Sequence, residues 1–394
     1  EIIFMIFFST VVVGWILRQL LKKGIAISWS SLNFPILLFL AFCVFSFIKA
    51  FYNNVGIMNW FAEWRVFLIL ISFFIILNEF KSKEELKWLI YSFLLITTLI
   101  CLRDIFLMIQ QGGLEHVRRV VGLQYASLFF IMAIPFSISI FLTTRHLLVK
   151  WLQIPLILLF IYRLLISIMR SYILALLVIL VIFLATLFVL KTFKNKRFFF
   201  RIVSLIILVC IISGVVFLIF PVQMDRIVKN TLIRFSVLKD FSSPQNMSAL
   251  SRVAEIKAAW NYAIKQPLLG HGFGFKYQYY RPNQKFYDVT YVHFIPLFFF
   301  LKIGFIGIFL ITWIITRVLS LNWQVLKNEK DLFWKFLEIA LFSNFIGFIV
   351  LSFFITSVIR IDSLFYFTLA AGIIATIKKI QKESNIMSKF ISLN

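Results

Sequence analysis

The 394-residue sequence is 62% hydrophobic and only 14% charged, with a mean hydropathy of +0.98. An average soluble domain is about 45–50% apolar and about 25% charged, so this chain has too little polar surface to cover a soluble globule. Its formal charge of +24 does not indicate nucleic-acid binding, because the basic residues separate long apolar runs and do not form one patch. The composition therefore indicates a polytopic membrane protein.

The apolar runs predict about eleven transmembrane helices and an all-α fold, since about 20 apolar residues span a bilayer as a helix. Runs such as Ile173–Leu190 do not alternate between apolar and polar residues, which excludes a transmembrane β-barrel. Cys43, Cys101 and Cys210 lie inside apolar runs and are expected to be buried hydrophobes, neither disulfides nor metal ligands. In chain order, the expected spans are Ile2–Leu17, Leu32–Ile48, Val66–Leu77 (short, with flanking residues to be added), Trp88–Ile109, Gly122–Leu142, Trp151–Ser167, Ser171–Leu190, Ile202–Phe220, Val292–Ile315, Phe333–Val358 and Leu364–Ile377.

Basic residues in the connecting segments predict the orientation of the chain. One set of alternate connections carries 21 Lys and Arg residues, and the opposite short connections carry seven. Because Lys and Arg concentrate in cytoplasmic loops, the first set is expected in the cytoplasm, together with the C-terminal tail. The long connection 221–291 is then extracytoplasmic. The cytoplasmic set comprises 18–30, 79–87, 144–150, 191–201, 317–335 and the tail after 377; the opposite set comprises 49–65, 110–121, 163–170 and 358–363.

The same pattern divides the chain into three parts: N-terminal transmembrane helices (1–220), an extracytoplasmic loop (221–291), and C-terminal transmembrane helices with a tail (292–394). Eleven spans with a cytoplasmic C-terminus would place Glu1 outside. The sequence starts without Met, and a further helix before Glu1 would give twelve spans and a cytoplasmic start.

The extracytoplasmic loop has its own helical pattern. Leu250, Val253, Ile256, Trp260 and Ala263 recur at helical spacing and predict an amphipathic helix over Ser248–Lys265 that ends before Pro267. Arg252 does not belong to that apolar stripe. The glycine-spaced segment Leu268–Gly274 predicts a tight turn; it lacks the strand and the Lys-Ser/Thr of a phosphate-binding loop.

Arginines and histidines gather on the outer side of the predicted bundle. Arg163 and Arg170 flank the apolar stretch Leu164–Met169, where a charge is costly unless it faces protein, water or an anion. Two interpretations remain open for each of these arginines, and for Arg252: a side chain that reaches solvent or headgroups, or a guanidinium that binds phosphate bidentately. His116, Arg118 and Arg119 precede the fifth span on the same side.

His293 lies at the outer mouth of the ninth predicted span. It is either an interfacial side chain or a general base, because imidazole titrates near neutral pH and can accept a proton from a sugar hydroxyl. Asp288 is the only acidic residue close to it in sequence. Lys302 falls inside the same span and would need a partner, or a bend at Gly304. Arginines and a histidine beside lipid suggest a lipid-linked pyrophosphate as ligand.

These segments resemble the O-antigen ligase/polymerase superfamily of bacterial membrane glycosyltransferases. The likeness is most specific in Ser251–Gly274, where Ser-Arg opens a helix and Pro-Leu-Leu-Gly-His-Gly follows it. Val292–Gly307 is similar to the family segment His-Asn…Glu-x-Gly-x-x-Gly, although Phe294 replaces the usual Asn and Lys302 stands where an acidic residue is common. Met169-Arg170-Ser171 and Arg118/Arg119 resemble two further arginine motifs of the family.

The resemblance implies an all-α, C-type-like glycosyltransferase of the bacterial cytoplasmic (inner) membrane. Its donor would be an undecaprenyl-pyrophosphate-linked glycan and its acceptor a glycan or lipid A–core, with the lipid bilayer and a chain-length regulator as further partners and no nucleic acid. It would use no nucleotide sugar, no cofactor and no obligatory metal. We expect an O-antigen or surface-polysaccharide polymerase; an O-antigen ligase is the alternative within the family.

The resemblance also assigns roles to residues. His293 would be the base toward the acceptor hydroxyl, and Arg170, Arg252 and one of Arg118 and Arg119 would bind the pyrophosphate. Arg163 is a further candidate for that set. A transporter of lipid-linked oligosaccharides is the competing class, but transporters tend to have internal repeats and midplane sites, whereas here no repeat is seen and the polar clusters lie at one surface.

Overall fold

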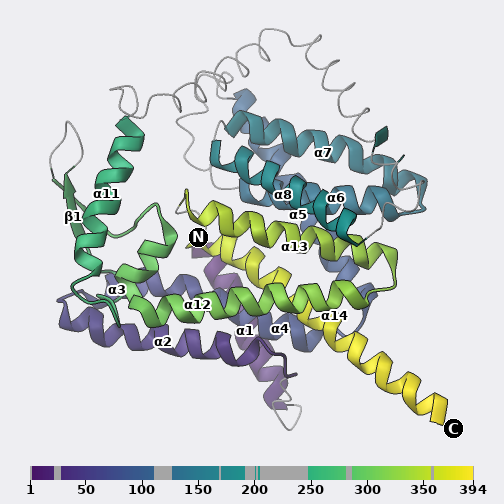
Figure 1. The fold of residues 1–394 in the computed structure, drawn as a ribbon, viewed down its shortest axis with the longest axis horizontal. Coiled ribbons are helices and arrows are strands. Elements are labelled where there is room, and N and C mark those ends of the chain that lie inside the picture. Colours follow the sequence, from purple (N-terminus) through teal and green to yellow (C-terminus); the bar gives the residue numbers. More distant parts are fainter. Residues whose placement is uncertain are drawn as a thin grey trace. The chain divides into compact units, whose positions relative to one another are not determined.

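The structure is a computed structural model that describes residues 2–21, 28–110, 127–167, 170–190, 200, 203–204, 247–280, 286–355 and 359–393. These residues are helical except for connecting loops and one two-stranded antiparallel hairpin (Figure 1). The helices are α1 (Ile2–Leu21), α2 (Asn33–Tyr52), α3 (Ile57–Trp64), the 3₁₀ segment η1 (Arg65–Ile71), α4 (Ser72–Glu79), α5 (Lys83–Gln110), α6 (Ser127–Thr143), α7 (Leu147–Ser167), α8 (Arg170–Val189), α11 (Met247–Ala263), α12 (Ile295–Asn328), α13 (Leu332–Ser352) and α14 (Ile361–Leu393).

In the part of the chain that the structure describes, eight helices are long and apolar enough to cross a membrane. The chain is a multi-pass membrane protein, consistent with the predicted all-α architecture. One predicted span, Ile202–Phe220, falls almost entirely outside the described residues, and each of the others overlaps a helix. The short span Val66–Leu77 gains its length from α3 and η1, which together with α4 form one membrane-length stretch, Ile57–Glu79.

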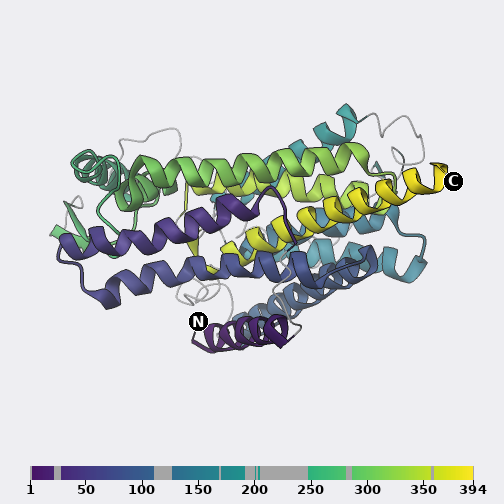
Figure 2. The same cartoon turned by 90° about the horizontal axis from the view of Figure 1, so that it is seen from below.

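The chain divides into two compact units, each with its own packing. One unit comprises residues 1–87, 251–328 and 352–394. In it α14 packs against α4 and η1, and α12 packs against α2 and α14, so that α2 and α12 run side by side (Figure 2). Gly372 allows close contact here, because a β-carbon at this position would meet the side chain of Ile76.

The other unit comprises residues 88–250 and 329–351, and α6 packs there against α7 and α8. Polar side chains connect α6 to α13: Ser139 Oγ donates to the carbonyl of Phe336 at 3.0 Å, and Asn344 Nδ2 to that of Met132 at 3.1 Å. Cys101, in α5, is buried, as is Cys43 in the first unit, and both are free thiols as predicted. Cys210 lies outside the described residues.

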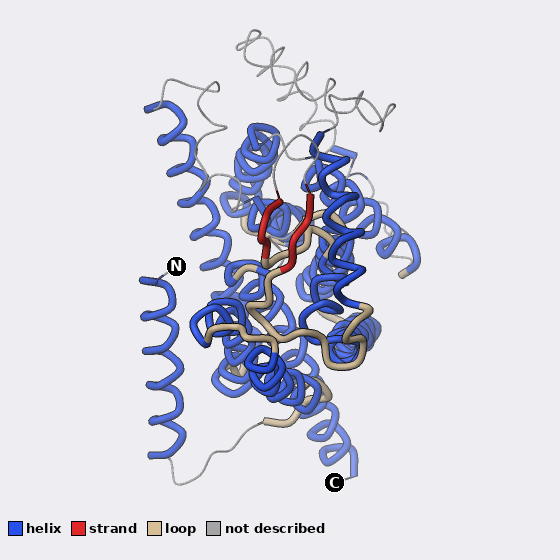
Figure 3. The backbone as a smooth tube through the Cα atoms, turned by 90° about the vertical axis from the view of Figure 1, so that its left-hand side faces the viewer, coloured by secondary structure: helices blue, strands red, loops and turns tan. Residues whose placement is uncertain are grey.

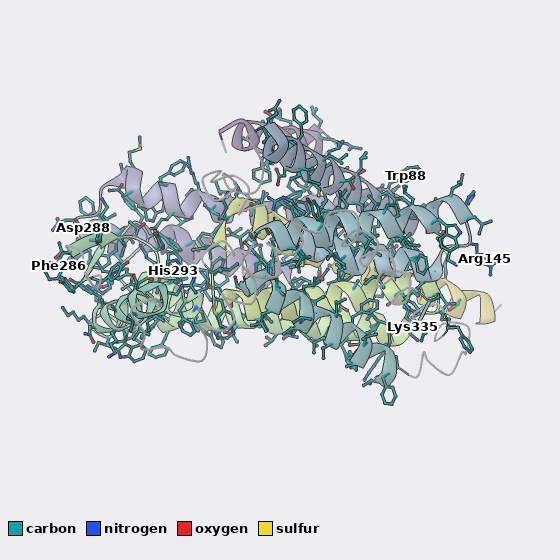
Figure 4. The ribbon with its side chains drawn as sticks, turned by 90° about the horizontal axis from the view of Figure 1, so that it is seen from above. Trp88, Arg145, Phe286, Asp288, His293 and Lys335 are labelled. Atoms are coloured by element: carbon teal, nitrogen blue, oxygen red, sulfur yellow. The ribbon has the colours of Figure 1, made fainter. Side chains whose placement is uncertain are left out.

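The hairpin follows α11 in the first unit (Figure 3). Its strands β1 (Tyr277–Tyr280) and β2 (Phe286–Val289) pair with Tyr277 opposite Val289 and Tyr280 opposite Phe286. The sequence patterns did not predict this hairpin. Strand β2 leads within a few residues to His293 and the start of α12, as Figure 4 shows for Phe286, Asp288 and His293.

Candidate functional site

The turn after α11 is interlocked with a break in α12. Gly304 has φ 62° and ψ −165°, a conformation that only glycine adopts readily, and it interrupts the helix. The carbonyls that the break leaves free, of Leu301 and Lys302, accept the N–H groups of His271 and Gly272 at 2.9 and 2.8 Å. Within a membrane, such freed backbone groups need protein partners. The Leu268–Gly274 segment is therefore a structural turn, as the sequence predicted, and the N–H groups of its three glycines and of His271 are committed to protein acceptors.

Lys302 is held at the same break. Its side chain is fully buried, and Nζ lies 3.0 Å from Glu63 Oε2 and 2.7 Å from the carbonyl oxygen of Phe275. The same carboxylate accepts the N–H of Gly274 at 2.7 Å, so Glu63 joins α3, the turn and α12. The sequence predicted that Lys302 would need a partner or a bend at Gly304, and the structure has both.

The interlocked turn places α11 beside the start of α12, where Glu255 meets His293. Glu255 Oε2 lies 2.7 Å from His293 Nδ1, and Oε1 accepts the backbone N–H of His293 at 3.2 Å. The carboxylate is 3% exposed and the imidazole 34% exposed. Because a carboxylate accepts, Nδ1 carries the hydrogen, and Nε2 is left with a lone pair that can take a proton.

Tyr277 completes the environment of the carboxylate. Its hydroxyl lies 3.4 Å from Glu255 Oε1 and donates to the carbonyl of Tyr291 at 3.0 Å. Burial, reinforced by the negative charge of Glu255, raises the pKa of Tyr277 well above its ordinary value. The phenol therefore stays protonated at neutral pH and serves as a donor. Together with His293 it fixes the orientation of the Glu255 side chain.

Helix α11 confirms the predicted helix over Ser248–Lys265 to within two residues. Its buried face consists of Ser251, Glu255, Ala259 and Ala263, each four residues apart. The predicted apolar stripe is mostly on the other face, where the side chains of Val253 and Trp260 are 51% and 52% exposed. The small residues of the buried face let the helix approach closely enough for Glu255 to reach His293.

The predicted arginines and His116 lie on different segments of the chain, and the structure describes only some of their side chains. Arg252 is exposed on α11, three residues before Glu255. Arg170 is the first residue of α8, and its side chain is not among those described; His116, Arg118 and Arg119 lie outside the described residues. Arg163 and Arg170 belong to the second unit, whereas Arg252 and His293 belong to the first.

Arg163 is buried in α7 and paired with protein. Its Nε and Nη2 donate to Asp104 Oδ2 at 3.1 and 2.9 Å, and both side chains are almost fully inaccessible. Arg103 adds a second contact to the same carboxylate, through Oδ1 at 2.7 Å. An arginine near hydrocarbon must face protein, water or an anion, and Arg163 faces protein.

Sequence reasoning missed Glu255. Asp288, the acidic residue close to His293 in the sequence, is exposed on β2, whereas the carboxylate that contacts His293 lies 38 residues upstream. One signal was available: Glu255 is the only acidic residue in α11, and it lies off the apolar stripe. An acidic residue in that position is a candidate partner for a nearby catalytic histidine.

The comparison with protein families agrees with the motifs. Residues 155–312 match the family model described as O-antigen ligase, a range that includes Arg163, Arg170, Arg252, Glu255 and His293. The comparison with curated proteins found no match. The matched range contains α11, the interlocked turn and the Glu255–His293 contact. The match supports the resemblance of this part of the chain to the O-antigen ligase/polymerase superfamily.

Proposed function

We propose that this protein transfers a glycan from undecaprenyl pyrophosphate to an acceptor hydroxyl on the outer side of the cytoplasmic membrane, as a polymerase of surface polysaccharide. The observation that supports the proposal best is the 2.7 Å contact between Glu255 and His293. It gives a partly exposed imidazole a buried carboxylate that fixes its tautomer. This is the arrangement that a general base requires.

His293 Nε2 accepts the proton of the acceptor hydroxyl as its oxygen attacks the anomeric carbon of the donor sugar. The bond between that carbon and the pyrophosphate oxygen breaks, and the lipid pyrophosphate leaves with the electron pair. Glu255 stabilises the imidazolium that forms, because it accepts the Nδ1 hydrogen bond in both protonation states. No step of this scheme uses a metal or an organic cofactor.

Among the arginines whose side chains the structure describes, we assign Arg252 to bind the pyrophosphate leaving group. It is exposed on the same helix as Glu255, and a guanidinium can bind pyrophosphate oxygens through two parallel hydrogen bonds. The family motifs add Arg170 and one of Arg118 and Arg119 to this role. We leave Arg163 out, because its guanidinium already pairs with Asp104.

Arg252→Lys tests this assignment. Lysine keeps the charge but loses the bidentate fork, so transfer should fall about tenfold, the loss of one charge-assisted hydrogen bond. Lys257→Arg, at another exposed basic position of α11, is the matched control and should leave the rate unchanged. Equal rates for wild type and Arg252→Lys would remove Arg252 from the pyrophosphate site.

Polymerase and ligase share the donor chemistry, so a deletion strain is needed to separate them. If the protein is a polymerase, lipopolysaccharide from the deletion strain should carry single repeat units on its core. Long glycans that remain on undecaprenyl pyrophosphate would instead establish the ligase. No observation on the described residues favours the ligase over the polymerase.

The transporter class makes a different prediction for purified protein. A glycosyltransferase releases undecaprenyl pyrophosphate when donor and acceptor are supplied together, whereas a transporter moves the intact donor across the bilayer. Reconstituted protein should therefore release the lipid pyrophosphate only when acceptor is present. Movement of the donor across the bilayer without any release would overturn the proposed transfer.

A further inference from the structure

Helix α11 carries an apolar stripe that faces away from its own unit. The stripe has four residues at steps of three and four, so they share one side of the helix: Val253, Ile256, Trp260 and Ile264. Ile264 directly follows the last residue of α11. Their exposed fractions are 51%, 36%, 52% and 51%. Single exposed apolar side chains are ordinary, but a continuous stripe of four indicates an interaction surface.

The stripe continues into the exposed surface of α12. The ring of Trp260 lies 5.7 Å from that of Phe300, which lies 4.6 Å from the ring of Phe305. Phe305 and Phe309 are 56% and 65% exposed on α12, a helix of membrane-spanning length and hydropathy. Large exposed apolar side chains on such a helix face lipid. The stripe of α11 is therefore continuous with a lipid-facing surface.

The direction of α11 also fits a contact of its stripe with lipid. It runs crosswise to α12 near the end of that helix where the hairpin lies, as Figure 1 shows, and it is seen almost end-on in Figure 2, where α12 lies lengthwise. A helix that runs crosswise to a membrane-spanning helix lies close to the plane of the membrane. Helices that lie in this plane with an apolar stripe on one side bind the boundary between headgroups and acyl chains.

We propose that α11 is an interfacial helix whose stripe, Val253, Ile256, Trp260 and Ile264, is immersed in the acyl chains of the bilayer. The partner is the lipid surface itself, and the opposite face, with Glu255, packs on the protein. The immersion holds the Glu255–His293 contact at headgroup level. The proposal does not depend on the proposed transfer reaction, because its test measures depth in the membrane.

Nitroxide labels on α11 test the proposal. Single cysteines at Val253, Trp260 and Ile264 are introduced into full-length protein whose three native cysteines are replaced by alanine. Asn261→Cys is the matched control, because Asn261 is exposed on the same helix and about 100° around its axis from Trp260. The labelled proteins are reconstituted in vesicles of phosphatidylethanolamine and phosphatidylglycerol, and collisions with oxygen and with a water-soluble nickel chelate are measured.

We expect the ratio of oxygen to nickel collisions to be several-fold higher at the three stripe positions than at Asn261. A ratio at the stripe equal to that at Asn261 would place the stripe in water and overturn the proposal. Low collision rates with both reagents and an immobilised label would mean that protein, such as a second copy of the chain, covers the stripe, and would overturn it as well.

A second measurement needs no cysteine and guards against misfolded labelled variants. Brominated phospholipids quench the fluorescence of tryptophans that contact acyl chains. The quenched fraction should be smaller in Trp260→Phe than in wild type, since phenylalanine keeps the apolar contact and removes one lipid-exposed indole. An unchanged quenched fraction would mean that Trp260 does not contact lipid and would contradict the proposal.

Discussion

The Glu63–Lys302 and Glu255–His293 contacts both involve the region of α12, but they differ in their exposure to solvent. Lys302 is 0% exposed and is enclosed by Glu63 and by the turn, whereas His293 is 34% exposed and its partner Glu255 is 3% exposed. An enclosed cation cannot contact a ligand, so the Lys302–Glu63 pair can only hold helices together. A partly exposed imidazole with one nitrogen oriented by a carboxylate can do chemistry. Exposure thus separates scaffold from proposed catalyst in two otherwise similar pairs.

The largest effect is expected from removal of the exposed member. His293→Ala should lower the transfer rate by about 10² to 10⁴, the usual contribution of a general base. The thermal unfolding midpoint should fall as well, because the buried Glu255 carboxylate loses its side-chain partner and keeps the backbone N–H of residue 293, so the rate is compared per folded molecule. The rate is measured as release of undecaprenyl pyrophosphate by purified protein.

His146→Ala is the matched control, since His146 is exposed before α7 and has no assigned role. It should keep the wild-type rate. Arg170→Ala should also abolish glycan transfer, because the family motif assigns Arg170 to pyrophosphate binding. Near-wild-type rates in both His293→Ala and Arg170→Ala would show that the site is wrongly assigned.

Lys302→Met should lower stability far more than it lowers the rate. It leaves the Glu63 carboxylate beside the turn without its cation, and removal of one partner of a buried pair typically costs about 3–5 kcal/mol. We expect about 3 kcal/mol, the lower end of that range, because Glu63 is 19% exposed. Denaturant unfolding in detergent gives the measurement, while the rate per folded molecule should fall much less than in His293→Ala.

The double variant Lys302→Met/Glu63→Gln sharpens the interpretation. It removes both charges, and the glutamine oxygen can still accept the N–H of Gly274, so most of the lost stability should return. If the double variant is as unstable as Lys302→Met, the cost arises from repacking at the break of α12 and not from the unpaired carboxylate.

Glu255→Gln probes the contact between carboxylate and imidazole. A glutamine amide can donate to Nδ1 and so favour the tautomer in which Nε2 carries the hydrogen and cannot accept a proton. We expect the turnover rate to fall about 10²-fold, the lower end of what a general base contributes, with the Michaelis constant for the donor unchanged. Tyr277→Phe is the control, since it removes the hydroxyl that lies 3.4 Å from Glu255 Oε1 but leaves the Glu255–His293 contact. Equal rate losses in both variants would mean that only the packing around Glu255 matters.

The comparison also shows how far the sequence could predict the site. It predicted α11, the tight turn and the need of Lys302 for a partner, because spacing, glycine placement and the cost of a buried charge are local properties. The partners themselves are not local: Glu63 precedes Lys302 by 239 residues, and Asp104 precedes Arg163 by 59. Periodicity identified the apolar stripe of α11 but not its surroundings, since it groups residues on a face without saying what that face contacts.

The smallest expected effect concerns pH and the turn that joins the two contacts. His271 is buried, stacks on Phe275, and donates from Nε2 to the carbonyl of Tyr262 at 2.8 Å. Burial lowers the pKa of His271 below its ordinary value. The unfolded chain therefore binds a proton more readily, and the stability that neutral His271 contributes is complete above about pH 6.5 and is lost as the pH falls below it. The unfolding midpoint of wild type should thus fall more between pH 7.5 and pH 5.5 than that of His271→Gln, which can keep the hydrogen bond but does not titrate. Since His293 is present in both proteins, the difference between the two pH profiles reports His271 alone, and identical profiles would show that its protonation is not coupled to folding.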